Sequence, residues 1–91
     1  MLNINDEIRK YRNLGFNKSQ LYEIYQGLLA DIDISQYANL NFDRYQMQEI
    51  RWGLEDNLDV SLYANTNFNF DQMNEIRFYL LARKEAGLNG Y

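Results

Sequence analysis

The chain repeats itself every 26 residues, and this periodicity limits its fold more than any other feature. Three copies align without a gap when Phe16, Phe42 and Phe68 are superposed. Further positions recur in register, some in all three copies and some in the first two: Gln20/Gln46/Gln72, Glu23/Glu49/Glu75, Ile24/Ile50/Ile76, Leu28/Leu54/Leu80, Asp33/Asp59, Ser35/Ser61, Tyr37/Tyr63, Ala38/Ala64 and Asn39/Asn65. A repeat of this length is typical of proteins built from stacked units, each of which contacts only its neighbours.

Each copy opens with the signals of a helix start. Asn17, Asp43 and Asn69 can each accept a backbone hydrogen bond as the N-cap, and a Gln three residues later can reach back toward the cap. Apolar residues then follow at the i, i+3 and i+7 spacing of a buried helical stripe. In the middle copy these residues are Met47, Ile50 and Leu54. The pattern predicts one long amphipathic helix in each copy.

A second, shorter helix is expected in the back half of the first two copies. Residues 33–38 and 59–64 each begin with an Asp that can cap a helix. Gly27 and Gly53 lie inside the preceding long helix, where glycine costs about 1 kcal/mol relative to alanine. We expect the next repeat to approach closely there, and the third copy, which has no successor, carries Tyr79 instead.

The ends of the chain are interpreted as caps. Residues 5–13 match the back half of a repeat, and the third copy continues as helix past Leu80 to a stop at Gly87. The predicted fold is all-α, a miniature α-solenoid of three 26-residue helix–turn–helix repeats in a single domain over residues 1–91. Its parts are an N-terminal capping half-repeat at 1–15, repeats at 16–41 and 42–67, and a last repeat with an extended C-terminal helix at 68–91.

Composition excludes most familiar chemistry. The chain of 91 residues has no Cys and no His, which rules out a disulfide, a thiolate zinc site and a histidine base. Its net charge of −4 disfavours direct contact with nucleic acid or an anionic membrane, which basic residues usually mediate. The sequence lacks both a membrane-span pattern and the apolar run of a signal peptide. We expect a cytoplasmic protein that is not an enzyme and has no cofactor or metal.

A calcium-like pattern precedes the helix of the middle copy. Asn39, Asn41 and Asp43 have the spacing of the first three ligands of a calcium loop. However, the glycine required at loop position 6 is Arg44, and the glutamate required at position 12 is Ile50. The same departures occur one repeat later, so we interpret both stretches as turns that end in a helix cap.

A column of carboxylates recurs at Glu23, Glu49 and Glu75. Stacking by one period places them on successive helices, and Arg51 and Arg77 each lie two residues beyond a glutamate. Nothing around them completes a catalytic set of nucleophile, base and orienting group. We therefore expect ion pairs between repeats, each worth about 0–1 kcal/mol if exposed.

The stretches 42–51 and 58–64 carry the signature Phe-Asp/Asn-x-x-Gln-Met-x-Glu-Ile-Arg, followed by Leu-Asp-Val-Ser-x-Tyr-Ala. This signature resembles a short helical repeat of uncharacterised proteins from Firmicutes, their phages and mobile elements. The resemblance covers Phe16 to about Leu80, except that Tyr25 replaces the arginine in the first copy. It implies a bacterial host cell and, by association, an inhibitor of a host defence nuclease, as anti-CRISPR proteins are. It carries no catalytic residues.

A binding surface is predicted from positions of the long helix that differ between copies. These are Ser19/Tyr45/Asp71, Tyr22/Gln48/Asn74, Gln26/Trp52/Phe78 and Leu29/Glu55/Leu81. They are offset by two residues from the core stripe and so lie about 200° around the helix. Because contiguous exposed apolar patches mark interaction sites, we predict that this face binds a protein partner. Its residues are Tyr22, Tyr45, Gln48, Trp52, Phe78 and Leu81. A homodimer contact and packing within the chain are the alternatives.

An acidic surface is the alternative binding site. Asp31, Asp33, Glu55, Asp56 and Asp59 cluster at the turns between the two helices of a repeat. Acidic clusters usually only face water. A functional role would be a phosphate-like row that occupies a basic channel of a nuclease, and such binding would weaken steeply with ionic strength.

Overall fold

The computed structural model describes residues 3–87, and over this range helices are the only regular secondary structure. Its elements are α1 (Ile4–Asn13), α2 (Lys18–Leu29), the 3-10 helix η1 (Ile34–Gln36), α3 (Arg44–Glu55), the 3-10 helix η2 (Val60–Leu62) and α4 (Phe70–Glu85). Within the same range no helix is long and apolar enough to cross a membrane. The predicted C-terminal stop at Gly87 is observed, with a left-handed φ of 78° just beyond the end of α4.

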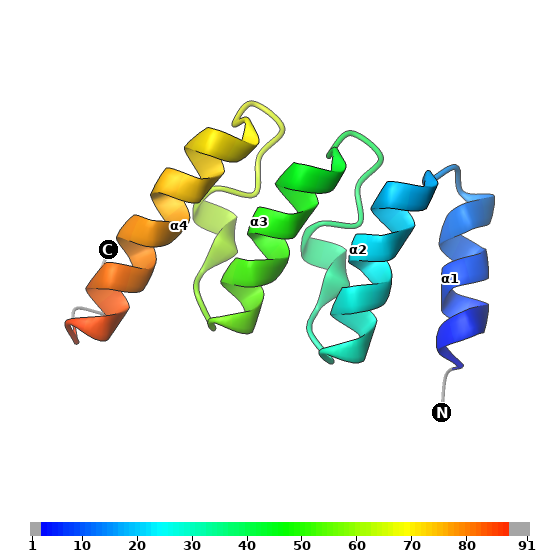
Figure 1. Ribbon diagram of the computed structural model, residues 1–91, viewed down its shortest axis with the longest axis horizontal. Coiled ribbons are helices and arrows are strands. Elements are labelled where there is room, and N and C mark those ends of the chain that lie inside the picture. Colours follow the sequence, from blue (N-terminus) through cyan, green and yellow to red (C-terminus); the bar gives the residue numbers. More distant parts are fainter. Residues whose placement is uncertain (1–2, 88–91) are drawn as a thin grey trace.

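The α-helices lie side by side in chain order, with α1 and α4 at the two ends of the row (Figure 1). Each α-helix packs against its neighbours in sequence, and η1 and η2 pack against α2 and α3 respectively. The molecule measures 41 × 30 × 15 Å. Because it is thin in one direction, each α-helix keeps a broad side exposed to solvent, and the end helix α4 has one side that no described element covers.

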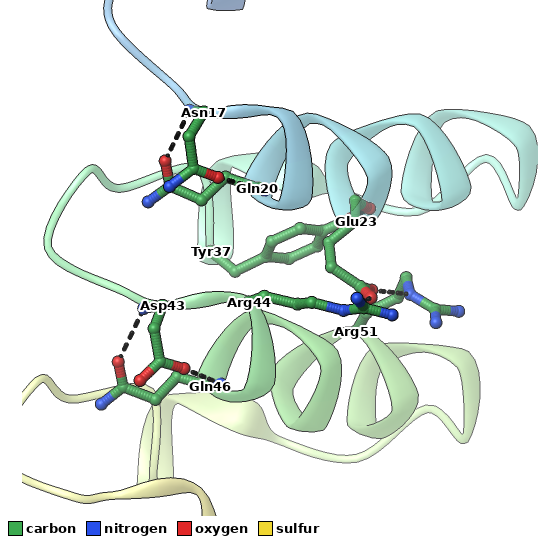
Figure 2. A network of polar contacts seen from close by, with 8 residues as sticks. All are labelled: Asn17, Gln20, Glu23, Tyr37, Asp43, Arg44, Gln46 and Arg51. Carbon is green, nitrogen blue, oxygen red and sulfur yellow. Dashed lines mark hydrogen bonds and ion pairs between the residues drawn. The ribbon is translucent and has the colours of Figure 1, made fainter.

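The helix starts follow from the capping residues. Asn17, Asp43 and Asn69 each accept a hydrogen bond from the backbone N–H of the Gln three residues later, and each Gln side chain accepts one from the cap, all at 2.9 Å. The Gln20 amide also donates to the Phe42 carbonyl at 2.8 Å, and the Gln46 amide donates to the Phe68 carbonyl at 2.7 Å. The first two capping glutamines therefore tie each helix to the start of the next one. Figure 2 shows the two capping boxes to which they belong.

The buried side chains come from the predicted stripe and from the 3-10 helices. The hydrophobic core consists of Phe16, Ile24, Ile34, Tyr37, Phe42, Met47, Ile50, Leu58, Val60, Tyr63, Met73 and Leu80. Ile8 and Tyr11 of α1 pack against this core from one end. The expectation that residues 5–13 cover the first long helix therefore agrees with the contacts of α1.

The short second helices differ from the prediction in length and type. Asp33 and Asp59 cap them as expected, each accepting from the backbone N–H two residues later. However, each is a single 3-10 turn, because the backbone leaves helical geometry at Tyr37 and Tyr63, where φ is −136° and −140°. The change of direction lets each tyrosine ring turn back toward the preceding α-helix, where it is fully buried.

The reason for the helical glycines also differs from the prediction. A Cβ on Gly27 would overlap the Tyr37 hydroxyl and lie 2.6 Å from Ile34 Cγ2. A Cβ on Gly53 would likewise overlap the Tyr63 hydroxyl and lie 2.8 Å from Val60 Cγ1. The close approach thus comes from the 3-10 helix of the same 26-residue copy and not from the next one, so the sequence-based explanation was wrong in this respect.

Candidate protein-binding surface

The six predicted contact residues fall into two groups by exposure. Tyr22 on α2, Tyr45 on α3 and Phe78 on α4 are exposed by 50%, 53% and 56%. Gln48, Trp52 and Leu81 are partly buried, and Leu81 packs against the core. The expectation that all of these side chains face solvent is therefore correct for the two tyrosines and Phe78, and wrong for Gln48, Trp52 and Leu81, which are partly buried.

An arginine joins the exposed tyrosines of α2 and α3. The guanidinium of Arg44 lies over the ring of Tyr22 at 5.6 Å and over the ring of Tyr45 at 5.8 Å. Tyr45 also contacts Phe70 at the start of α4, with ring centroids 5.4 Å apart. This cluster therefore includes residues of three helices. It is open to solvent, because Phe70 is 43% exposed and the Arg44 side chain is 46% exposed.

A second cluster lies between α3 and α4. The Arg77 guanidinium is 5.1 Å from the Trp52 ring centroid and 4.8 Å from that of Phe78. This contact explains why Trp52 is partly buried, since Arg77 of the next helix covers its ring. On α3 the two clusters are connected, because Tyr45, Gln48 and Trp52 follow one another at i, i+3 and i+7 along one side of the helix.

We call these two clusters together the aromatic–arginine surface, which consists of Tyr22, Arg44, Tyr45, Trp52, Phe70, Arg77 and Phe78. Sequence reasoning missed Arg44 and Phe70, and it placed Arg77 only in an ion pair between copies. A signal was present, because Lys18, Arg44 and Phe70 occupy one position of the repeat and differ in every copy. Cation–π contacts of this kind contribute about 0.5–1 kcal/mol at exposed sites. They leave the rings of Tyr22, Tyr45 and Phe78 exposed, whereas Arg77 itself is buried.

Buried ion pairs connect the helices that carry this surface. Arg51 Nε donates to Glu23 Oε2 at 2.8 Å, and Arg77 Nε donates to Glu49 Oε2 at 2.6 Å. The predicted pairing between copies is confirmed for these two glutamates, but the pairs are buried instead of exposed. Glu75, on the end helix, is exposed.

The two buried carboxylates differ in one hydrogen bond. Glu49 Oε1 accepts from the Asn74 amide at 2.8 Å, whereas Glu23 Oε1 is buried and accepts no hydrogen bond. Gln48 occupies the position on α3 that Asn74 occupies on α4. The nearest cation to Glu23 Oε1 besides Arg51 is Arg44, whose Nε is 4.0 Å away. Figure 2 shows both arginines extending toward the Glu23 carboxylate.

The acidic turn residues are largely engaged within the chain. Glu55 accepts a hydrogen bond from Arg51 Nη1 at 2.6 Å, and Asp56 Oδ2 lies 4.0 Å from Arg77 Nη1. The hydroxyl of Ser35 donates to Asp33 at 2.6 Å, and this bond holds the pKa of that exposed carboxyl below its usual value. Asp59 caps η2 in the same way as Asp33 caps η1.

Asp31 completes the set of acidic residues. It is exposed and adopts a left-handed φ of 56° in the turn after α2. The five acids therefore serve mainly as helix caps, turn residues and ion-pair partners. They do not form a row of unengaged carboxylates.

The aromatic–arginine surface lies on an open part of the molecule. Residues 3–87 contain no cleft or enclosed pocket, and no group of three or more acidic side chains is arranged to hold a metal ion. Small-molecule sites are usually concave, whereas protein interfaces use exposed aromatic and arginine side chains on open surfaces. Comparisons of the chain with protein-family models, curated proteins and solved structures find no match.

Proposed function

We propose that the protein is a non-enzymatic binding module of the bacterial cytoplasm, and that it contacts a protein partner through the aromatic–arginine surface. We further propose that its scaffold is a small solenoid of three 26-residue repeats. The equal spacing of the three capping boxes supports this, as do the matching contacts of Tyr37 with Glu23 and of Tyr63 with Glu49. A stack of such units presents successive helices at regular intervals, which suits an extended binding surface.

One observation carries the functional proposal: Arg44 lies between two half-exposed tyrosine rings and makes no hydrogen bond to another described side chain. Arginine and tyrosine are enriched among the residues that dominate the energy of protein interfaces. The rings restrict the guanidinium before binding, so less conformational entropy is lost when a partner acceptor reaches it. The Glu23 carboxylate pairs most closely with Arg51, at 2.8 Å, and its contact with Arg44 Nε is longer, at 4.0 Å, so a partner acceptor that reaches the exposed Arg44 guanidinium competes only with this longer contact.

Inhibition of a defence nuclease through the acidic turns is the weaker candidate. Glu55 and Asp56 lie close to arginines of the chain itself, and Asp33 and Asp59 cap the 3-10 helices. Using them as a phosphate mimic would require a partner to compete with these contacts. A nuclease that binds the aromatic–arginine surface instead is compatible with the proposal, because the proposal specifies the surface of this chain that makes the contact and not the class of the partner protein.

Site-directed photocrosslinking tests which surface meets a partner. The photoreactive residue benzoylphenylalanine is introduced at Tyr22 or Tyr45 in the proposed surface, at Asp31 in the acidic turns, or at Leu62 as the control. Leu62 is 44% exposed on η2, which packs on the Gly53 side of α3. Leu62 is a suitable control because Arg44, which lies in the proposed surface, is nine residues from Gly53 and therefore about half a turn around α3 from the side where η2 packs.

The variants are expressed in a Firmicutes cell and irradiated there. We expect one adduct of defined mass from positions 22 and 45, and no such adduct from position 62. An adduct from position 31 alone would support the acidic turns, and equal adducts from all positions would contradict a specific surface. An adduct of twice the chain's mass from positions 22 and 45 would identify a second copy as the occupant and would contradict a different partner.

A further inference from the structure

The end helix α4 carries a second stripe that points away from the rest of the molecule. Glu75, Phe78, Tyr79 and Ala82 follow one another at i, i+3, i+4 and i+7, the spacing of a helix face that packs against another element. Arg77, two residues from Glu75 and about 200° around the helix, reaches back to Glu49 on α3. The stripe therefore lies on the outer side of the row, where Figure 1 shows α4 at the end of the molecule.

The same stripe is covered on the two preceding helices. On α3, Glu49 is buried under Arg77 and Gly53 under Tyr63. On α2, Glu23 is buried under Arg51 and Gly27 under Tyr37. On α4, by contrast, Glu75 is exposed, and Phe78 and Tyr79 are exposed by 56% and 60%.

The exposed apolar residues of α4 also favour a contact on its outer side. Met73 and Leu80 face the core, while Phe70, Phe78 and Tyr79 are exposed on other sides of the same helix. Large apolar side chains therefore lie on the outer side of α4 as well as on its core side, beside the polar residues of the helix. Exposed apolar side chains that lie together often mark a contact with another molecule.

The charges on the outer stripe are arranged for pairing with themselves. The acids Asp71 and Glu75 precede Tyr79, and Arg83 follows it, with its guanidinium 5.6 Å from the Tyr79 ring. Glu75 and Arg83 are each four residues from Tyr79. In an antiparallel pair of α4 helices that cross at Tyr79, the acid of each helix therefore lies opposite the arginine of the other.

We propose that the protein forms a two-fold symmetric dimer in which the outer stripes of two α4 helices pack antiparallel, centred on Tyr79. Each Glu75 then meets an arginine from a neighbouring helix, as Glu23 and Glu49 do inside the chain. A contact of this kind is isologous, since the same patch serves both subunits, and it closes after two copies. The dimer leaves the Tyr22 and Arg44 cluster at the opposite part of the row open to a partner.

Charge reversal tests the geometry of this dimer. The dissociation constant of the purified full-length chain is measured by sedimentation equilibrium over a range of concentrations. Glu75→Arg alone and Arg83→Glu alone each place like charges opposite one another, and we expect each to weaken dimerisation by about tenfold or more. The double variant Glu75→Arg/Arg83→Glu restores opposite charges, and we expect its dissociation constant to return close to that of the parent chain.

Disulfide trapping gives an independent test, because the chain has no cysteine of its own. With oxidised glutathione as the oxidant, Tyr79→Cys should form a covalent dimer readily, since the two-fold axis brings the two copies of this position together. Leu14→Cys is the control, because this residue is 58% exposed in the turn after α1. It should react slowly and only at high protein concentration. Circular dichroism checks that each variant remains helical.

Three results would overturn the dimer. The first is a parent chain that sediments as a monomer at every concentration. The second is a dimer whose dissociation constant is unchanged by Glu75→Arg, and the third is equal covalent trapping at positions 14 and 79. Phe78 belongs to both surfaces, but Tyr22, Arg44 and Tyr45 take no part in the dimer contact. Failure of the dimer therefore leaves that part of the partner surface intact, and failure of that part leaves the dimer intact.

Discussion

The Tyr37 hydroxyl donates a hydrogen bond of 2.6 Å to the backbone carbonyl of Glu23, and it does so across the place where Gly27 has no side chain. Tyr63 makes the same bond to Glu49 across Gly53. Each tyrosine thereby fastens a 3-10 helix to the α-helix that precedes it. The carbonyl it reaches belongs to the glutamate that pairs with the next helix, so one residue connects both contacts.

Gly53→Ala should destabilise the protein by about 2 kcal/mol or more. Helix propensity alone predicts a gain of about 1 kcal/mol, but the new methyl group overlaps the Tyr63 hydroxyl and lies close to Val60. Urea unfolding followed by circular dichroism measures the change. Ser19→Ala, at an exposed helical position, is the control and should alter stability by less than about 0.5 kcal/mol. Equal stability of Gly53→Ala and the parent would show that the Tyr63 side chain can move away from the new methyl group at little cost.

Arg77→Met should cost about 3–5 kcal/mol, because it leaves the buried Glu49 carboxylate without its cation. Adding Glu49→Gln in the same chain should recover part of this loss, since the neutral amide is cheaper to bury. The matched control is Arg9→Met, which breaks an exposed ion pair with Asp6 and should change stability by less than about 0.5 kcal/mol. Similar losses of stability in Arg77→Met and Arg9→Met would show that burial of the ion pair does not determine its contribution.

Gln48→Asn should stabilise the protein by about 1 kcal/mol. The shorter amide is placed to donate to Glu23 Oε1, which accepts no hydrogen bond, as Asn74 donates to Glu49 Oε1. The reverse change, Asn74→Gln, should remove that bond and destabilise. Thermal unfolding of the two variants side by side gives both signs, and a loss of stability in Gln48→Asn would refute the equivalence of the two positions.

Stability should fall in alkaline solution. Burial raises the pKa of the Tyr37 and Tyr63 hydroxyls far above their ordinary value. Because the folded state holds these protons more tightly, their contribution is fully present below the unfolded pKa of about 10 and is lost as pH rises above it. Each tyrosine contributes a slope of about 1.4 kcal/mol per pH unit in that range.

The variant Tyr63→Phe isolates this effect. It removes one of the two protons, so the slope of unfolding free energy against pH above about 10 should be reduced by about 1.4 kcal/mol per pH unit. Tyr45→Phe, at an exposed position, serves as the control and should leave the slope unchanged. The slope is compared, because Tyr63→Phe also loses a hydrogen bond and lowers stability at every pH.

Local signals in the sequence predicted the elements that local contacts determine. The caps at Asn17, Asp43 and Asn69 depend on residues three positions apart, and all were placed correctly. The pairing of Glu23 with Arg51 was also predictable, because the repeat fixes their relation in space once stacking is assumed. Exposure of Tyr45 followed from its helix position alone.

Contacts that depend on backbone direction or on side-chain conformation were not predictable in this way. The approach to Gly27 comes from Tyr37, whose ring turns back only because the second element is a single 3-10 turn. Trp52 is half-covered because Arg77 lies over it from the next helix. The contact of Arg44 with the two tyrosine rings likewise requires side chains from two helices to meet.

The affinity of an isolated partner for surface variants tests the central claim most directly. The protein captured by crosslinking is purified, and its binding to the chain is measured by titration calorimetry. Tyr45→Ala should weaken binding by about 2 kcal/mol or more, which corresponds to about 30-fold, because exposed aromatics that become buried dominate interface energy. Leu62→Ala, at an exposed position of η2 outside this surface, should bind within about threefold of the parent. If Tyr45→Ala remains folded and binds as tightly as the parent, the aromatic–arginine surface is not where this protein meets its partner.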